Sequence, residues 1–79
     1  MSILGSYKNC FVETFGIQED VLPNLEYQGV IEWDSVGHMT LITVLEECFD
    51  IEMDIDDITE FSSFKVGMDI LAKYGVKFD

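Results

Sequence analysis

Residues 32–49 have the sequence EWDSVGHMTLITVLEECF, and this stretch decides the fold. Asp34 is a good N-cap for a helix that begins at Ser35, because its carboxylate can accept a hydrogen bond from a free backbone amide. Apolar residues then recur at helical spacing, at Val36, Met39, Ile42, Leu45 (or Val44) and Phe49. The pattern predicts an amphipathic helix over residues 35–49, with this stripe facing the core.

Similar signals predict helices before and after this one. Tyr7, Phe11 and Phe15 recur every four residues and Gly16 can end a helix, which predicts a first helix over residues 2–15. Ser63 can cap a last helix over residues 63–74, with Gly75 after its end. Residues 56–61 are expected to form a short helix between them.

The remaining segments are expected to be connections. Residues 16–34 contain Pro23 and Gly29, and their apolar members are predicted to pack against the core: Ile17, Val21, Leu22, Leu25, Val30 and Ile31. Residues 50–58 alternate acidic and apolar side chains, which would normally favour a strand. A lone strand in a helical domain has no partner, so this segment is expected to begin as a loop whose apolar residues turn inward.

Together these elements predict an all-α fold. It is a small antiparallel helical bundle of three main helices and one short helix, with a long first loop. At 79 residues, the chain is expected to be a single domain over residues 1–79.

The charge of the chain is strongly negative. Sixteen acidic residues face four basic ones, for a net charge of −12. This balance excludes nucleic acid as a partner, because phosphate backbones require Lys and Arg. The acidic surface serves either solubility alone or docking to basic patches on other proteins.

The chain has no apolar run of membrane length, and we expect a soluble, cytoplasmic, monomeric protein without a membrane span.

Cysteine and carboxylate spacing predicts no metal site. Cys10 and Cys48 are far apart in the sequence, and we expect small apolar residues in a reducing compartment rather than a disulfide. The acidic residues from Asp50 to Asp56 are spaced by two, as in a calcium-binding EF-hand loop. That loop also needs Gly at its sixth position and Glu at its twelfth, and no register of this segment supplies both.

Three residues near the start of the 35–49 helix are candidates for function. Ser35 is placed where free amides and the helix dipole stabilise an anion. His38 lies one turn beyond it, but the sequence has no G-x-S-x-G motif and no second histidine, so a partly exposed helix histidine is favoured over a catalytic dyad. Trp33 is expected to be a core or loop anchor, with an exposed contact residue as the alternative.

One family shares the order of motifs in this chain. Asp34-Ser35 is followed by an apolar residue, and Leu45-Glu46-Glu47 comes near the end of the same helix. An apolar-acidic loop follows, and Ser63-Phe64 opens a last helix that reaches Leu71. From Glu32 to about Leu71 these features resemble the acyl carrier proteins, which are also small and acidic. The resemblance implies the same helical fold.

The resemblance also implies a prosthetic group. In that family the serine that matches Ser35 receives 4′-phosphopantetheine from coenzyme A, and the terminal thiol of this arm holds an acyl group as a thioester. By this match Ser35 is the covalent attachment residue and Asp34 is its adjacent motif residue. A phosphopantetheinyl transferase supplies the chemistry, so the chain itself is expected not to be an enzyme.

Partners follow from the same resemblance. They are the transferase and a set of acyl- or aminoacyl-loading and acyl-transfer enzymes with basic docking patches. The residues that match the family's docking surface are Val36, Met39, Glu46 and Glu47.

The chain departs from the fatty-acid carriers in ways that favour a specialised member. Gly37 and Thr40 stand where acidic residues are usual, Val36 replaces the commoner Leu, and Trp33 is unusual before the aspartate. Two alternatives remain open: an aminoacyl or peptidyl carrier of a dedicated biosynthetic cluster, and an acidic helical adaptor without a prosthetic group.

Overall fold

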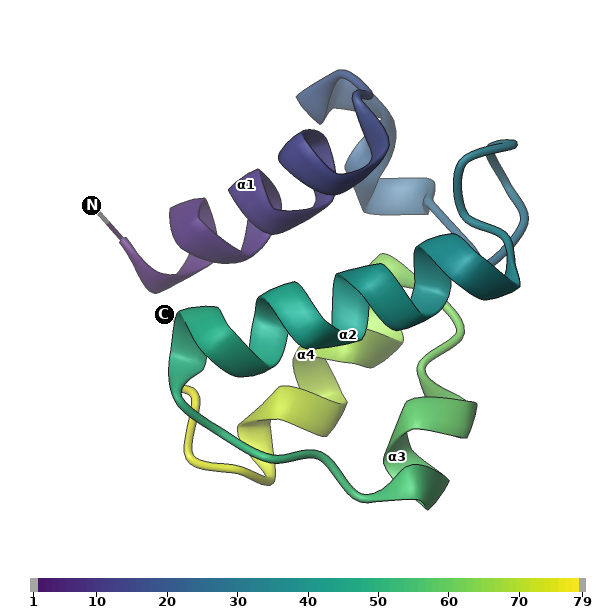
Figure 1. Cartoon of the computed structure of the whole chain (residues 1–79). Helices are drawn as coiled ribbons and strands as arrows, with labels where there is room; N and C mark the ends of the chain where they lie inside the picture. The colour runs from purple at the N-terminus through teal and green to yellow at the C-terminus, as the bar shows by residue number, and fades with distance from the viewer. Residues whose placement is uncertain (1, 79) are drawn as a thin grey trace.

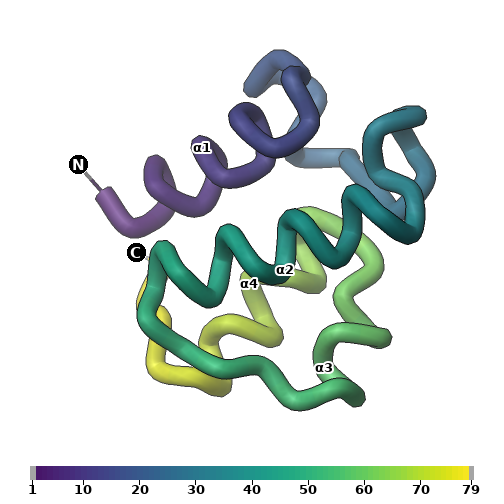
Figure 2. Tube along the Cα trace, in the orientation of Figure 1, coloured from purple at the N-terminus to yellow at the C-terminus, as the bar shows by residue number. Residues whose placement is uncertain are grey.

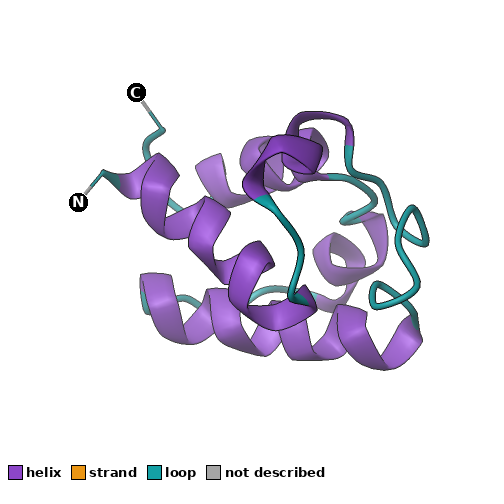
Figure 3. Cartoon of the chain, turned by 90° about the horizontal axis from the view of Figure 1, so that it is seen from above, coloured by secondary structure: helices purple, strands orange, loops and turns teal. Residues whose placement is uncertain are grey.

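The computed structural model describes residues 2–78, which form four α-helices and one 3₁₀ helix (Figure 1). They are α1 (Ile3–Phe15), η1 (Glu19–Asn24), α2 (Ser35–Phe49), α3 (Ile55–Glu60) and α4 (Phe64–Ala72). Between residues 2 and 78 there is no strand, and the one β-type pairing is an isolated bridge between Glu26 and Ser63 (Figure 3). The helices pack around one hydrophobic core, and the predicted all-α bundle is confirmed.

The predicted helix bounds are close to the observed ones. The bounds of α2 are as predicted. Those of α1 differ by one residue at the start, and those of α3 and α4 differ by one or two residues at both ends. The side chains of Ser2, Asp34 and Ser63 each accept a hydrogen bond from the amide three residues ahead. Gly16 ends α1 in the left-handed conformation, with φ of 64°. These are local interactions, and a short stretch of sequence is enough to predict them.

The core lies mainly between α1, α2 and α4. Helices α1 and α2 run side by side in opposite directions, and α4 lies against them with α3 at its start (Figure 1). Tyr7 of α1 is fully buried, and its hydroxyl donates a hydrogen bond of 2.6 Å to the backbone carbonyl of Phe64 in α4. The side chains buried from these three helices are Tyr7, Cys10, Phe11, Phe15, Leu41, Ile42, Leu45, Phe64, Ile70 and Leu71.

The predicted stripe of α2 is wrong at its first two positions. Val36 is 76% exposed and Met39 is 51% exposed, whereas Leu41 is fully buried. The helix is apolar on most of its circumference, so several stripes have the correct spacing. Packing against α1 and α4 selects the face centred on Leu45 and leaves Val36 and Met39 in solvent.

The first connection is well packed only in part. It lies at the end of the bundle where α2 begins (Figure 2). Leu22 and Leu25 are buried, but Val21 is 43% exposed and Ile31 is 91% exposed, so the prediction of inward packing is wrong for these two. Backbone hydrogen bonds hold the connection to the segment before α4, from the Tyr27 amide to the Ser62 carbonyl and from the Phe64 amide to the Leu25 carbonyl.

The segment after α2 is a loop, as predicted, and its apolar residues do not all turn inward. Met53 is buried and Ile51 is half-buried, but Ile55, the first residue of α3, is 78% exposed. The left-handed conformation of Asp50, with φ of 54°, ends α2 and turns the chain into this loop.

Charged groups lie on the surface. No polar or charged residue is buried in the described part of the chain, so its acidic residues are at least partly exposed. No helix between residues 2 and 78 has the length and apolar character needed to cross a membrane.

Candidate functional site

Ser35 is the first residue of α2, and its side chain is exposed. Asp34 caps the helix: its Oδ1 atom accepts a hydrogen bond of 2.8 Å from the amide of Gly37. The hydroxyl oxygen of Ser35 lies 3.3 Å from that of Tyr27, a hydrogen bond in which either group can be the donor. The predicted site residues Asp34 and Ser35 are therefore together at an accessible helix start, where the dipole favours an anion.

The connection before α2 comes very close to its first turn. A Cβ atom on Gly37 would lie 2.0 Å from the carbonyl oxygen of Glu32 and 3.2 Å from the ring of Phe15. No side chain fits at this position without a shift of the backbone. The absence of an acidic residue here, a departure from fatty-acid carriers, thus has a local packing reason.

Replacing Gly37 with alanine should lower the free energy of unfolding by about 1–3 kcal/mol, as overpacking commonly does. Alanine gains roughly 1 kcal/mol in helix propensity, but the clash with a backbone oxygen outweighs this gain. Urea unfolding followed by circular dichroism measures the change. Thr40→Ala, on the exposed side of the same helix, is the control and should be neutral or slightly stabilising. A Gly37→Ala chain as stable as that control would contradict the close approach.

Trp33 is fully buried and anchors the end of the connection. Its ring stacks on Phe15, with ring centroids 5.5 Å apart and an interplanar angle of 26°. The indole and imidazole rings of Trp33 and His38 are nearly parallel, at an interplanar angle of 15° with centroids 6.1 Å apart, and the Trp33 Nε1–H donates a hydrogen bond of 2.9 Å to His38 Nδ1. Of the two predictions for Trp33, the core anchor is confirmed.

The side chain of His38 links two segments by hydrogen bonds: the connection before α2, and helix α3. Because Nδ1 accepts from Trp33, the proton of the neutral ring is on Nε2, which donates a hydrogen bond of 2.8 Å to the carbonyl of Ile58. The ring is half-buried, as a partly exposed helix histidine should be. Both ring nitrogens are engaged, so this arrangement leaves no lone pair for a proton from Ser35.

Helix α3 is also held by the residues that directly follow α4. Lys73 Nζ lies 2.6 Å from Asp57 Oδ1, and the Tyr74 hydroxyl donates to the other oxygen of the same carboxylate. The hydrogen bond from Lys73, and to a lesser extent the one from Tyr74, holds the pKa of Asp57 below its usual value. The Tyr74 hydroxyl also accepts a hydrogen bond of 2.9 Å from the amide of Asp54. These contacts fix α3 opposite the first half of α2.

An apolar cavity of about 570 Å³ lies between α2, α3 and the segment before α4, with Ser35 on its rim. Met39 contributes from α2 and Ile58 from α3, and His38 lies in the wall between them. The complete lining is Tyr27, Ser35, His38, Met39, Met53, Ile55, Ile58, Thr59, Phe61 and Ser62. Sequence analysis missed Tyr27 and the α3 residues as site residues. The alternating apolar positions of residues 51–58 were the available signal.

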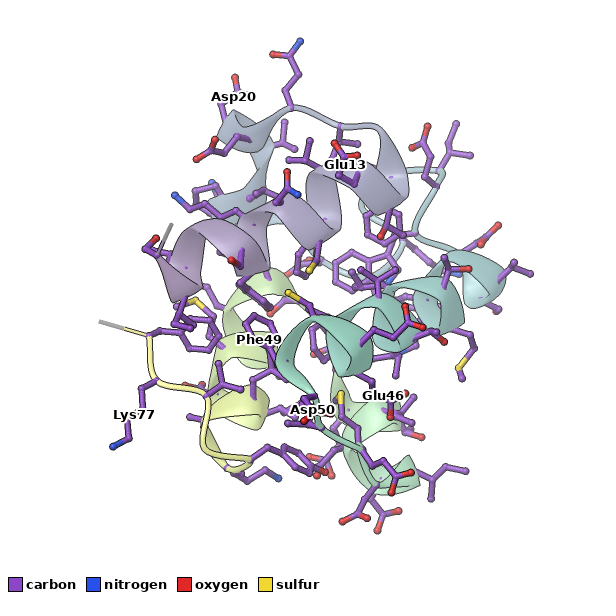
Figure 4. The ribbon with its side chains drawn as sticks, turned by 60° about the vertical axis from the view of Figure 1, so that its left-hand side comes forward. Glu13, Asp20, Glu46, Phe49, Asp50 and Lys77 are labelled. Atoms are coloured by element: carbon purple, nitrogen blue, oxygen red, sulfur yellow. The ribbon has the colours of Figure 1, made fainter. Side chains whose placement is uncertain are left out.

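The four residues predicted to bind partners have different surroundings. Val36, Met39 and Glu47 are exposed on the solvent side of α2. Glu46, labelled in Figure 4 near the C-terminal end of α2, is half-buried. Its Oε2 accepts a hydrogen bond of 2.9 Å from the amide of Met53 in the loop after the helix. This bond anchors the loop after α2, which gives a structural reason for a carboxylate near the negative end of the helix dipole.

No protein-family model matches this chain, and no solved structure matches it. The resemblance of residues 32–71 to acyl carrier proteins stays a prediction from the sequence. The geometry around Ser35 consists of an exposed hydroxyl, a capped helix start and an adjoining apolar cavity.

Proposed function

We propose that this chain is an acyl carrier protein that bears 4′-phosphopantetheine on Ser35. The observation that carries the proposal is an exposed serine at the capped start of α2, on the rim of an apolar cavity. In this function the chain presents an acyl group, bound as a thioester, to partner enzymes in the cytoplasm. When bound, the prosthetic group supplies the thiol that holds the acyl group.

The residues around Ser35 fit a phosphodiester. The first amides of a helix lack intrahelical partners, and Asp34 satisfies one of them, that of Gly37. The remaining amides and the helix dipole favour a negative group on the adjoining side chain. The hydroxyl of Tyr27 is 3.3 Å from that of Ser35 and can donate to a phosphate oxygen there. A transferase can reach Ser35 because its side chain is exposed.

The cavity fits an apolar cargo. Its wall includes Met39, Met53, Ile55, Ile58 and Phe61, and its volume is about 570 Å³. Moving an alkyl chain from water to such a surface is favourable by about 0.8 kcal/mol for each buried CH₂ group. This observation favours an acyl group over a charged aminoacyl group as the cargo, and an aminoacyl or peptidyl carrier remains the alternative.

The exposed side of α2 suits docking to basic partners. Val36 and Met39 present apolar surface next to Ser35, and Glu47 is on the same side of the helix. With a net charge of −12, the chain attracts basic surfaces at long range and so speeds encounter. The proposed partners are a phosphopantetheinyl transferase and acyl-loading and acyl-transfer enzymes.

Incubation of the full chain with coenzyme A and a broad-specificity phosphopantetheinyl transferase tests the proposal. We expect the intact mass to rise by one phosphopantetheine group, and fragmentation to assign the group to Ser35. An established carrier protein in the same tube shows that the transferase is active. If the control is modified and this chain is not, the carrier function is contradicted, and an acidic helical adaptor without a prosthetic group is the better explanation. The mass of the protein purified from its native cells then distinguishes acyl from aminoacyl cargo.

A further inference from the structure

The two cysteines lie at one interface, although they are distant in the sequence. Cys10 is on α1 and is 5% exposed, and Cys48 is exposed in the last turn of α2. Both line a hollow of about 430 Å³ between the two helices, and both are free thiols. Nothing in the proposed carrier function uses either of them.

Packing of α1 against α2 places both cysteines on the same hollow. Ser6, Cys10 and Glu13 of α1 face the same hollow as Val44 and Cys48 of α2, so each helix contributes residues three or four apart. Axes of packed helices are about 8–10 Å apart, and Cα atoms lie about 2.3 Å from each axis. Cα atoms that face each other directly are therefore roughly 3.5–5.5 Å apart, and this interval overlaps the range that a disulfide spans.

The titration of Cys10 is consistent with this proximity. Burial is the main cause that raises the pKa of Cys10 to about 12, and the nearby Cys48 thiol is the next largest. A buried thiol with a raised pKa is a poor nucleophile, whereas an exposed thiol is open to reagents. Cys48 is therefore the residue that reacts first.

We propose that Cys10 and Cys48 form a reversible intramolecular disulfide that cross-links α1 to α2 when the chain meets a small-molecule disulfide such as oxidised glutathione. The thiolate of Cys48 attacks one sulfur of the reagent, the reagent's S–S bond breaks, and one glutathione thiolate leaves. The thiolate of Cys10 then attacks the Cys48 sulfur and releases the second glutathione. The two cysteines lose two electrons to glutathione and two protons to water.

The second step, the attack of Cys10 on the mixed disulfide, requires the Cys10 thiolate. Once Cys48 is in a mixed disulfide it has no thiol that can hydrogen-bond to Cys10 or ionise, so its contribution to the raised pKa of Cys10 is lost. Burial still disfavours the Cys10 thiolate, so ring closure is expected to speed up as pH rises.

The disulfide is also expected to stabilise the fold. The bond closes a loop from residue 10 to residue 48, which removes conformational freedom from the unfolded chain. The melting temperature should rise by roughly 10 °C or more.

The test uses the full Ser35→Ala chain, so that no thiol of a prosthetic arm takes part and the result does not depend on the carrier function. After treatment with oxidised glutathione at low protein concentration, we expect a monomer lighter by two hydrogens, with no thiol open to alkylation. Peptide mapping should recover Cys10 joined to Cys48. The oxidised chain should melt higher than the reduced one, and a reductant should reverse the shift.

Two variants serve as controls. Cys48→Ser changes an exposed residue and should prevent the disulfide. Thr43→Cys added to Cys48→Ser keeps an exposed thiol on α2 but outside the hollow, and should give only the mixed disulfide with glutathione. The proposal is overturned if the parent chain stops at the mixed disulfide, forms only dimers, or gains a disulfide that fails to raise its melting temperature.

Discussion

Replacing Ser35 with alanine is expected to abolish attachment of phosphopantetheine while leaving the fold intact. Alanine lacks the oxygen through which the phosphodiester forms, so the adduct should fall from full occupancy to none. The fold should be unaffected because Ser35 is exposed and its side-chain contact is a 3.3 Å hydrogen bond to Tyr27 at the surface. The cap belongs to Asp34, which remains. Exposed substitutions of this kind change stability by about 0.5 kcal/mol or less.

Intact mass after incubation with transferase and coenzyme A measures the adduct, and a thermal melt measures the fold. The melting temperature of Ser35→Ala should stay within about 4 °C of the parent. Ser62→Ala is the matched control, because Ser62 is an exposed serine that lines the same cavity. It should accept the group as the parent does. An adduct that persists on Ser35→Ala would place the attachment elsewhere and remove the basis of the proposed function.

Replacing Trp33 with alanine is expected to lower the free energy of unfolding by about 3–5 kcal/mol, the usual loss for a large buried aromatic residue. Trp33 is fully buried, stacks on Phe15, and donates the hydrogen bond that orients His38. At about 0.05–0.15 kcal/mol per residue, the whole domain has a stability of about 4–12 kcal/mol. The substitution therefore removes a large share of it.

Urea unfolding followed by circular dichroism at 222 nm measures this loss, since the variant has no tryptophan fluorescence. Trp33→Phe keeps a buried ring but leaves His38 Nδ1 without its donor, so its loss should be smaller, about 1–3 kcal/mol. Ile31→Ala, at a residue that is 91% exposed two positions earlier, should change stability by less than about 0.5 kcal/mol. If Trp33→Ala lost no more than Ile31→Ala, Trp33 would not be the anchor of the connection.

The helices could be predicted from the sequence because their ends depend on neighbours along the chain. Asp34 and Ser63 each bond to an amide three residues ahead, and Gly16 adopts a left-handed conformation that other residues rarely take. The position of Ser35 at a helix start is a consequence of the same local chemistry. The fold class followed, because helices of this length with apolar stripes bury those stripes against one another.

The tertiary structure alone decided which parts of these helices meet. Spacing permitted more than one buried face for α2, and packing against α1 and α4 chose the one that leaves Val36 and Met39 exposed. The sequence marks Gly37 as a weak helix residue, whereas the structure shows a site of close approach to Glu32. The cavity beside Ser35, the hydrogen bonds of His38 and the hollow that both cysteines line each involve segments that are distant in the sequence. Local preferences contain no information on such contacts, because they depend on how whole helices are placed.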